Sequence, residues 1–172
     1  MFAVLQQLLA ITVLRAGPQD LPVDPRLPIW LAGAYALVGG MVLSSRLSFA
    51  EGVAQAGLDA LLLAAFAWGV LRFRGFPERF IQTYAALLGV NLLLALLSWP
   101  LFAMAPLDTA ATQLSVAQVG LLVALLWTLI AQGQILRSAL ELGAGLGLLL
   151  AFAYFTAASL IIAAVFPAGA PA

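Results

Sequence analysis

The sequence contains no cysteine, no histidine and no lysine. Without cysteine, the chain cannot form a disulfide, a thiolate nucleophile, an iron–sulfur cluster or a cysteine-bound zinc site. Without histidine, it lacks the commonest ligand of haem and transition metals and the base of a serine–histidine triad. Schiff-base chemistry requires a lysine. We therefore expect no metal site, no cofactor and no enzymatic activity.

Charged residues are also scarce. They make up 8% of the 172 residues, and seven arginines balance seven acidic residues. A typical soluble domain has about a quarter of its residues charged. Here 65% of the residues are hydrophobic and the mean hydropathy is +1.12. The composition predicts a protein that has lipid as its solvent. A nucleic-acid partner is not expected, because such binding needs clustered positive charge.

Five apolar stretches are long enough to cross a bilayer, which takes about 20 residues. They cover residues 27–44, 53–71, 80–104, 114–136 and 142–166. The segments between them are short and carry glycine, proline or charge, which is typical of turns. The predicted fold class is therefore all-α, a polytopic membrane helical bundle with about five transmembrane helices. These helices form one transmembrane domain over residues 27–166.

The first 16 residues, MFAVLQQLLAITVLRA, are apolar but too short for a crossing. They lack the positive charge that precedes the apolar run of a signal peptide. Gln6 and Gln7 favour a face turned to water, so we predict a short N-terminal interfacial helix; packing against the bundle is the alternative. Residues 1–26 then form this helix and a Pro-rich linker, and residues 167–172 form a flexible tail.

The arginines predict the orientation in the membrane. If the N-terminus is cytoplasmic, six of the seven arginines lie at cytoplasmic ends of spans, and Arg46 alone lies outside. The six are Arg15, Arg26, Arg72, Arg74, Arg79 and Arg137. We expect a protein of the bacterial inner (cytoplasmic) membrane, with a cytoplasmic N-terminus and a periplasmic C-terminus.

Three polar residues inside the spans form a possible intramembrane site: Asp59, Asn91 and Gln132. A carboxylate in a bilayer is costly, so Asp59 is a candidate proton relay or cation ligand. The alternative is an acid near the interface that is hydrated or capped by a neighbouring helix. Asn91 falls near the middle of the membrane, where it either bonds a neighbouring helix or lines a pore.

The densest positive patch consists of Arg72, Arg74 and Arg79 in the turn after the second span. This patch is a candidate contact for an anionic lipid headgroup or for an acidic segment of a partner. The alternative interpretation is that these arginines determine the topology and that the turn anchors the spans at the membrane interface.

Small residues recur every fourth position in two spans, a spacing that lets helix backbones approach closely. They are Ala32, Ala36 and Gly40 in the first span, and Gly143 and Gly147 in the fifth. The spacing predicts helix contacts there, either within one chain or between chains.

Two segments carry a resemblance to a known family. RGFPERFIQTYAALLGVN enters the third span, and WTLIAQGQILRSALELGAGLGLLLAF joins the fourth to the fifth. With the five spans, these segments resemble the bacterial relatives of the Yip-domain membrane proteins. The resemblance covers residues 27–166 and implies a five-helix fold and a scaffolding role. The long N-terminal region of the eukaryotic members has no counterpart here, so a GTPase partner is not implied.

Three functions remain open at this point. The leading hypothesis is a non-enzymatic accessory subunit or scaffold that acts through helix packing, with membrane lipids and other membrane subunits or a second copy as partners. The alternative is a small oligomeric transporter or channel subunit using Asp59 and Asn91, which requires polar residues that face a shared cavity. A third, a lipid-modifying enzyme, would use Glu78 or Glu141 with the arginine patch.

Overall fold

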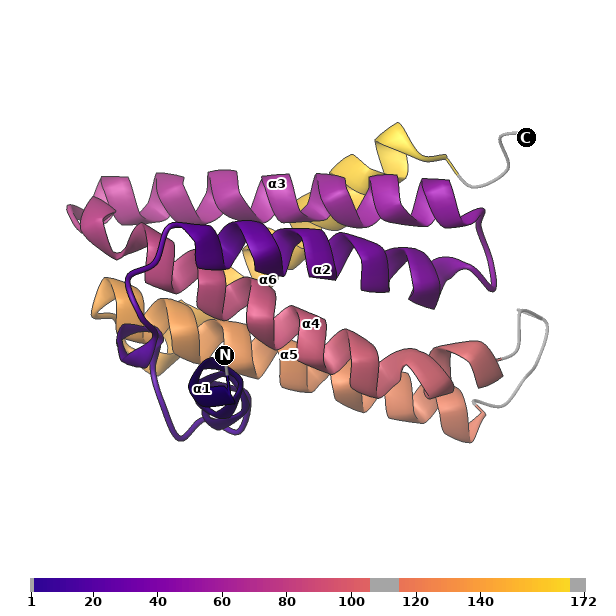
Figure 1. Cartoon of the computed structure of the whole chain (residues 1–172), viewed down its shortest axis with the longest axis horizontal. Coiled ribbons are helices and arrows are strands. Elements are labelled where there is room, and N and C mark those ends of the chain that lie inside the picture. Colours follow the sequence, from indigo (N-terminus) through magenta and orange to yellow (C-terminus); the bar gives the residue numbers. More distant parts are fainter. Residues whose placement is uncertain (1, 106–114, 168–172) are drawn as a thin grey trace.

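The computed structural model describes residues 2–105 and 115–167, and within these ranges the chain is helical and contains no strand (Figure 1). The predicted all-α bundle is confirmed, because five helices are long and apolar enough to cross a membrane. The α-helices are α1 (Phe2–Thr12), α2 (Arg26–Leu43), α3 (Phe49–Arg74), α4 (Phe80–Met104), α5 (Val116–Leu140) and α6 (Ala144–Val165). Two short 3-10 turns, η1 (Pro18–Asp20) and η2 (Pro77–Arg79), precede α2 and α4.

Two of the long helices are longer than the hydropathy pattern predicts. α3 begins at Phe49 because Ser48 and Glu51 form a capping box, and it ends at Arg74 because Gly75, with a φ of 82°, caps it. α5 continues to Leu140, so Arg137 lies inside the helix and not in the turn after it. Hydropathy misses these ends because they are polar, whereas capping residues decide where a helix starts and stops.

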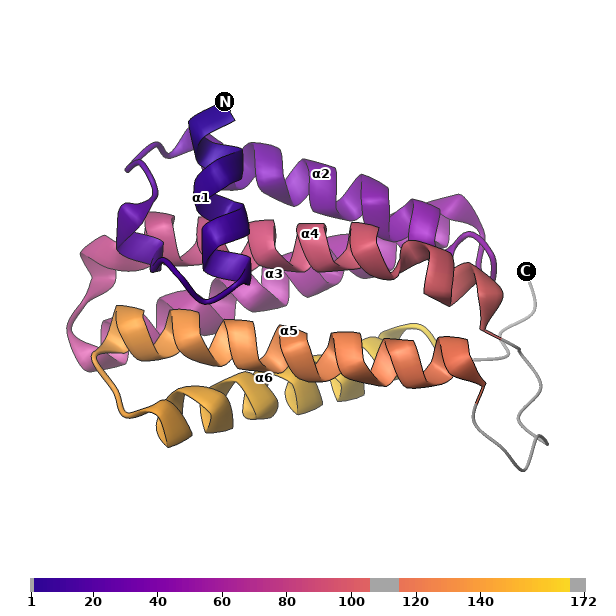
Figure 2. The same cartoon turned by 90° about the horizontal axis from the view of Figure 1, so that it is seen from below.

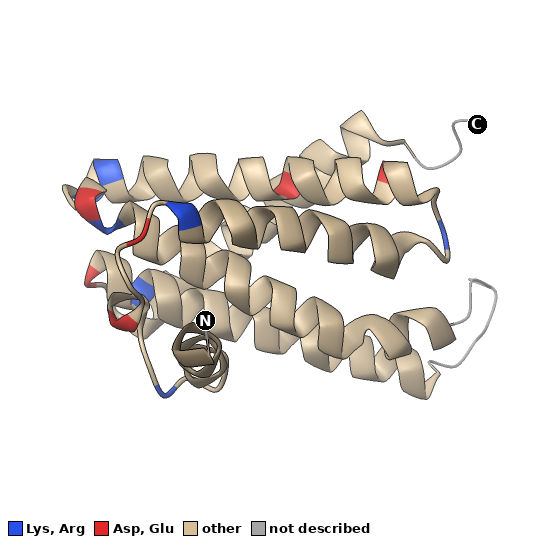
Figure 3. Cartoon of the chain, viewed as in Figure 1, with Lys and Arg blue, Asp and Glu red and all other residues tan. Residues whose placement is uncertain are grey.

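The five long helices run along a common direction, as the two perpendicular views show (Figure 1, Figure 2). α2 packs on α3 and α5 packs on α6, while α4 lies between the pairs and contacts α2, α3 and α5. Most charged residues lie at one end of the bundle, and few occur along the length of the helices (Figure 3). We call the end with the α3–α4 and α5–α6 turns the arginine end, and the end with the α2–α3 loop the far end.

α1 lies across the other helices and not along them (Figure 2). Its Leu8 packs against Gly89 of α4, where a Cβ atom would collide with the leucine side chain. The indole nitrogen of Trp127 in α5 donates a hydrogen bond to the carbonyl oxygen of Thr12 at 3.0 Å. Gln6 is exposed and Gln7 is half-buried. The helix is therefore packed crosswise against the bundle, and its place at the membrane interface stays a prediction.

Small residues make two close helix contacts inside the chain. Gly40 of α2 meets Gly52 of α3, and a Cβ on Gly52 would lie 3.0 Å from the Cα atom of Gly40. Gly147 of α6 meets the carbonyl group of Gly133 in α5. Ala32 and Ala36 are half-buried, and Gly143 has open space around it. Gly40 and Gly147 are thus used within one chain.

The core is concentrated toward the arginine end. The largest side chains that are fully buried there come from α3, α4 and α5, and they include Leu63, Leu71, Leu87, Leu88, Ile135, Leu136 and Leu140. None of the largest fully buried side chains among the described residues lies in the other half of the bundle.

Candidate functional site

Asp59 is held between two tyrosines from different helices. The hydroxyl of Tyr35 in α2 donates to Oδ2 of Asp59 at 2.7 Å, and the hydroxyl of Tyr154 in α6 donates to Oδ1 at 2.7 Å. The Tyr154 hydroxyl also lies 3.0 Å from the backbone carbonyl oxygen of Asp59. Such short bonds are typical of hydroxyls that donate to a carboxylate. The acid therefore joins α2, α3 and α6 at one point.

The two amides of the predicted site bond to each other. Nε2 of Gln132 in α5 donates to Oδ1 of Asn91 in α4 at 2.8 Å, and both side chains are buried. In a bilayer such a bond between helices contributes roughly 0.6 kcal/mol on average. The Nδ2 group of Asn91 and the Oε1 atom of Gln132 keep hydrogen-bonding capacity beyond this pair.

A cavity of about 410 Å³ brings Asp59, Asn91 and Gln132 together. Helices α2 to α6 all contribute to its walls. Tyr35 and Tyr154 line it near Asp59, and Thr128 lines it one helical turn from Gln132. The three polar residues that the sequence singles out therefore face one shared space, although they come from three different helices.

The cavity extends from these polar residues toward the far end of the bundle. Its remaining lining includes the last residues of α2, the first turns of α3 and α5, and the later turns of α4 and α6, among them Leu43, Gln55, Ser98, Leu121, Ser159 and Ile162. Toward the arginine end, the leucine-rich core closes the bundle. The site is thus a recess with polar residues at its deep end and a lining that continues toward the far end of the bundle.

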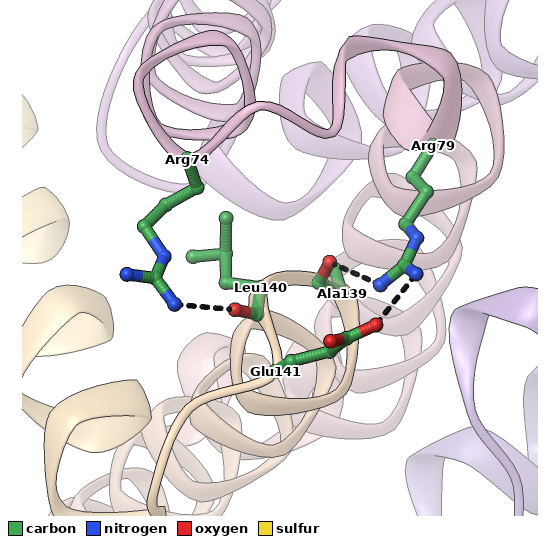
Figure 4. Close-up of polar contacts among 5 residues, drawn as sticks. All are labelled: Arg74, Arg79, Ala139, Leu140 and Glu141. Carbon is green, nitrogen blue, oxygen red and sulfur yellow. Dashed lines mark hydrogen bonds and ion pairs between the residues drawn. The ribbon is translucent and has the colours of Figure 1, made fainter.

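The arginine patch serves as a cap on α5. Arg74 donates to the carbonyl oxygen of Leu140 at 3.3 Å, and Arg79 donates to that of Ala139 at 3.0 Å (Figure 4). Arg79 also forms an ion pair with Glu141 at 2.6 Å. Cations at a helix C-terminus are favourable because they meet its unpaired carbonyl groups and the negative end of its dipole. Two of the three predicted lipid-contact arginines therefore hold the α3–α4 turn against α5.

Arg72 differs from these two arginines, because its guanidinium lies over the Trp68 ring at 5.9 Å. Glu141 pairs with Arg79 and not with its sequence neighbour Arg137, which instead donates to the side-chain oxygen of Gln134 at 3.3 Å.

A smaller cavity of about 310 Å³ lies beside Arg79 and is lined also by Gln82 and Thr83. The buried Thr83 hydroxyl has no hydrogen-bond partner among the described residues, and the cavity is large enough to hold ordered water.

The tyrosines are the site residues that sequence reasoning missed. In apolar helices a tyrosine resembles an ordinary packing residue, since most of its surface is a hydrophobic ring. The sequence signal that could have identified these tyrosines is their position deep within the membrane spans. Tyr35 is nine residues into α2 and Tyr154 is ten residues into α6, so both hydroxyls need a partner inside the membrane.

The fold and the cavity define a multi-pass helical membrane protein with a polar recess among its spans. No protein-family model, no curated protein and no solved structure matches the chain. The resemblance to the bacterial relatives of the Yip-domain proteins stays a prediction. The function is therefore inferred from the geometry of the site itself.

Proposed function

We propose that the protein binds a small solute in the recess around Asp59 and acts as a small transporter or as a subunit of one. The observation that carries this proposal is the shared cavity, because Asp59, Asn91 and Gln132 would not need to face one space if each only joined two helices. Pockets that bind small molecules are typically concave, largely apolar and fitted with a few convergent polar groups. The recess has these features.

The proposal includes the orientation predicted from the arginines. With the arginine end in the cytoplasm of a bacterial cell, the recess would open to the periplasm. A solute would enter from outside and meet Asp59 about 15 Å inside the first residue of α3, at 1.5 Å per residue. The packed arginine end would have to loosen before the solute could leave on the other side.

Water access to the recess is tested with single cysteines, since the natural chain has none. Ser98 lines the cavity, whereas its neighbour Leu97 is 71% exposed on the outside of the bundle, where lipid would cover it. We expect Ser98→Cys in intact cells to react with a membrane-impermeant thiol reagent, and Leu97→Cys to stay unlabelled, because a thiol must ionise in water to react. Equal labelling of the two cysteines would argue against an open recess.

An accessory role without transport is the second candidate function. It is favoured by the arginine end, where large side chains of α3, α4 and α5 are fully buried and close the bundle. Thr128→Cys near the floor of the recess separates the two candidates. In sealed vesicles of defined orientation, a transporter should expose this cysteine to impermeant reagent from each side in turn, whereas an accessory subunit should expose it from the periplasmic side only.

A further inference from the structure

Among residues 2–105 and 115–167, Asp59 has no positively charged partner. All seven arginines lie within the part of the chain that the structure describes, and the one ion pair found there joins Arg79 to Glu141 at the arginine end. Two tyrosine hydroxyls bond the Asp59 carboxylate, but hydroxyls are neutral. An ionised carboxylate inside a membrane needs a compensating charge. A cationic ligand bound in the recess would supply that charge.

The number of acids limits the charge of that ligand. Within residues 2–105 and 115–167, Asp59 is the only acidic residue that lines the cavity, and no group of three or more acidic, histidine or cysteine side chains there could hold a metal. Divalent cations are typically held by several carboxylates or other oxygen ligands in a tight shell. A single carboxylate with neutral amides and hydroxyls matches a monovalent cation better.

The walls of the recess favour a cation with an apolar body. They include Leu94, Leu125, Leu129 and Phe155, and the cavity of about 410 Å³ is far larger than one ion. At about 30 Å³ per water molecule, a bare inorganic ion there would sit among roughly a dozen waters. An organic ion would instead place its carbon skeleton against the leucines and its charge beside Asp59. The rings of Tyr35, Tyr154 and Phe155 can add cation–π attraction.

We propose that the recess binds a monovalent organic cation, with its ammonium group beside the Asp59 carboxylate and its apolar part against the leucine and phenylalanine walls. This inference rests on the proposed function, because it names the ligand class of the same cavity. It goes further in one respect: the solute must carry positive charge, which a merely polar recess would not require.

The test compares two probes of nearly equal shape, phenethylammonium and the neutral phenethyl alcohol. Their binding to the whole chain is measured by titration calorimetry in nanodiscs of zwitterionic phosphatidylcholine, which has no net charge to attract the cation. We expect wild-type protein to bind the ammonium at least about 30-fold more tightly than the Asp59→Asn variant does, the size typical of removing one partner of a buried charge pair. The control Glu51→Gln, at the exposed start of α3, should bind like the wild type.

The possible failures are distinguishable. If wild-type protein binds alcohol and ammonium equally well, the charge requirement is overturned while the proposed solute site stands. If sodium or potassium chloride displaces the ammonium at millimolar concentration, the organic part of the inference is wrong. If neither probe binds and Ser98→Cys is also unlabelled, the proposed function fails as well. The comparison of the two probes on wild-type protein needs no variant, so it holds even if Asp59→Asn does not fold.

Discussion

Replacing Gly147 with leucine is expected to lower the free energy of unfolding by more than about 3 kcal/mol, the upper part of the range for overpacked cores. A Cβ atom at this position would collide with the carbonyl oxygen of Gly133 and lie 2.9 Å from Cβ of Arg137. Both groups belong to α5, and one of them is backbone, so neither can rotate away. The α5–α6 contact would have to separate. Unfolding with increasing sodium dodecyl sulfate in mixed micelles, followed by circular dichroism, measures the loss.

Gly145→Leu is the matched control for this substitution. Gly145 lies in the same first turns of α6, is exposed, and has nothing within 4 Å of the position of its Cβ. Leucine is a better helix former than glycine by up to about 1 kcal/mol, so the control should be neutral or slightly stabilising. If the two variants were equally stable, the close α5–α6 contact would not exist in the membrane.

This pair of variants also separates folding from assembly. Small-residue spacing alone predicts that Gly143 and Gly147 make contacts, without saying whether these lie within one chain or between chains. Because Gly147 packs on α5, loss of an oligomer in Gly147→Leu would only reflect a damaged protomer. Gly143 and Gly145 are open, so a changed oligomeric state in Gly145→Leu would instead indicate a contact between chains. The oligomeric state of variants at Gly143 and Gly145, and not at Gly147, therefore tests the accessory-subunit proposal.

Much of the fold follows from the sequence because the bilayer imposes simple rules. A span must be long, apolar and helical, since no water is available to backbone groups in lipid, and five such spans are readable from composition alone. The polar residues Asp59, Asn91 and Gln132 stand out for the same reason. The partners of these residues cannot be identified from the sequence, because pairing depends on the orientation of each helix about its own axis. That rotation is set by contacts such as Gly40 on Gly52, which hydropathy does not encode.

The arginine patch shows a second limit of sequence reasoning. The sequence predicts that the patch lies in a turn and that it acts as a topology signal. Its use as a cap for α5 depends on where a helix 60 residues later ends, and hydropathy places that end four residues too early. The extra turn brings the carbonyl groups of Ala139 and Leu140 under Arg79 and Arg74. Local sequence thus identifies the charges, whereas tertiary packing determines what they bind.

Tyr154→Ala is expected to cost about 3 kcal/mol of stability, in line with other truncations of buried aromatic residues. Tyr154 is buried, its ring lies 5.2 Å from that of Phe66 in α3, and its hydroxyl bonds Asp59. α6 packs mainly on α5, and this side chain joins it to α3 through Phe66 and Asp59. The control is Phe152→Ala, because Phe152 lies on the same helix and is 55% exposed. It should cost less than about 1 kcal/mol.

The hydroxyl bond itself is measured by a double-mutant cycle of Tyr154→Phe and Asp59→Asn, read out by the same unfolding titration. Each single variant should cost about 0.6 kcal/mol or more, since that is the average for a hydrogen bond between helices in a membrane. The double variant should cost less than the sum, because the second change removes a bond that is already lost. A coupling near zero would mean that α6 does not reach Asp59. The recess would then lack the wall that holds its acid in place, and the organic-cation site would have to be abandoned with it.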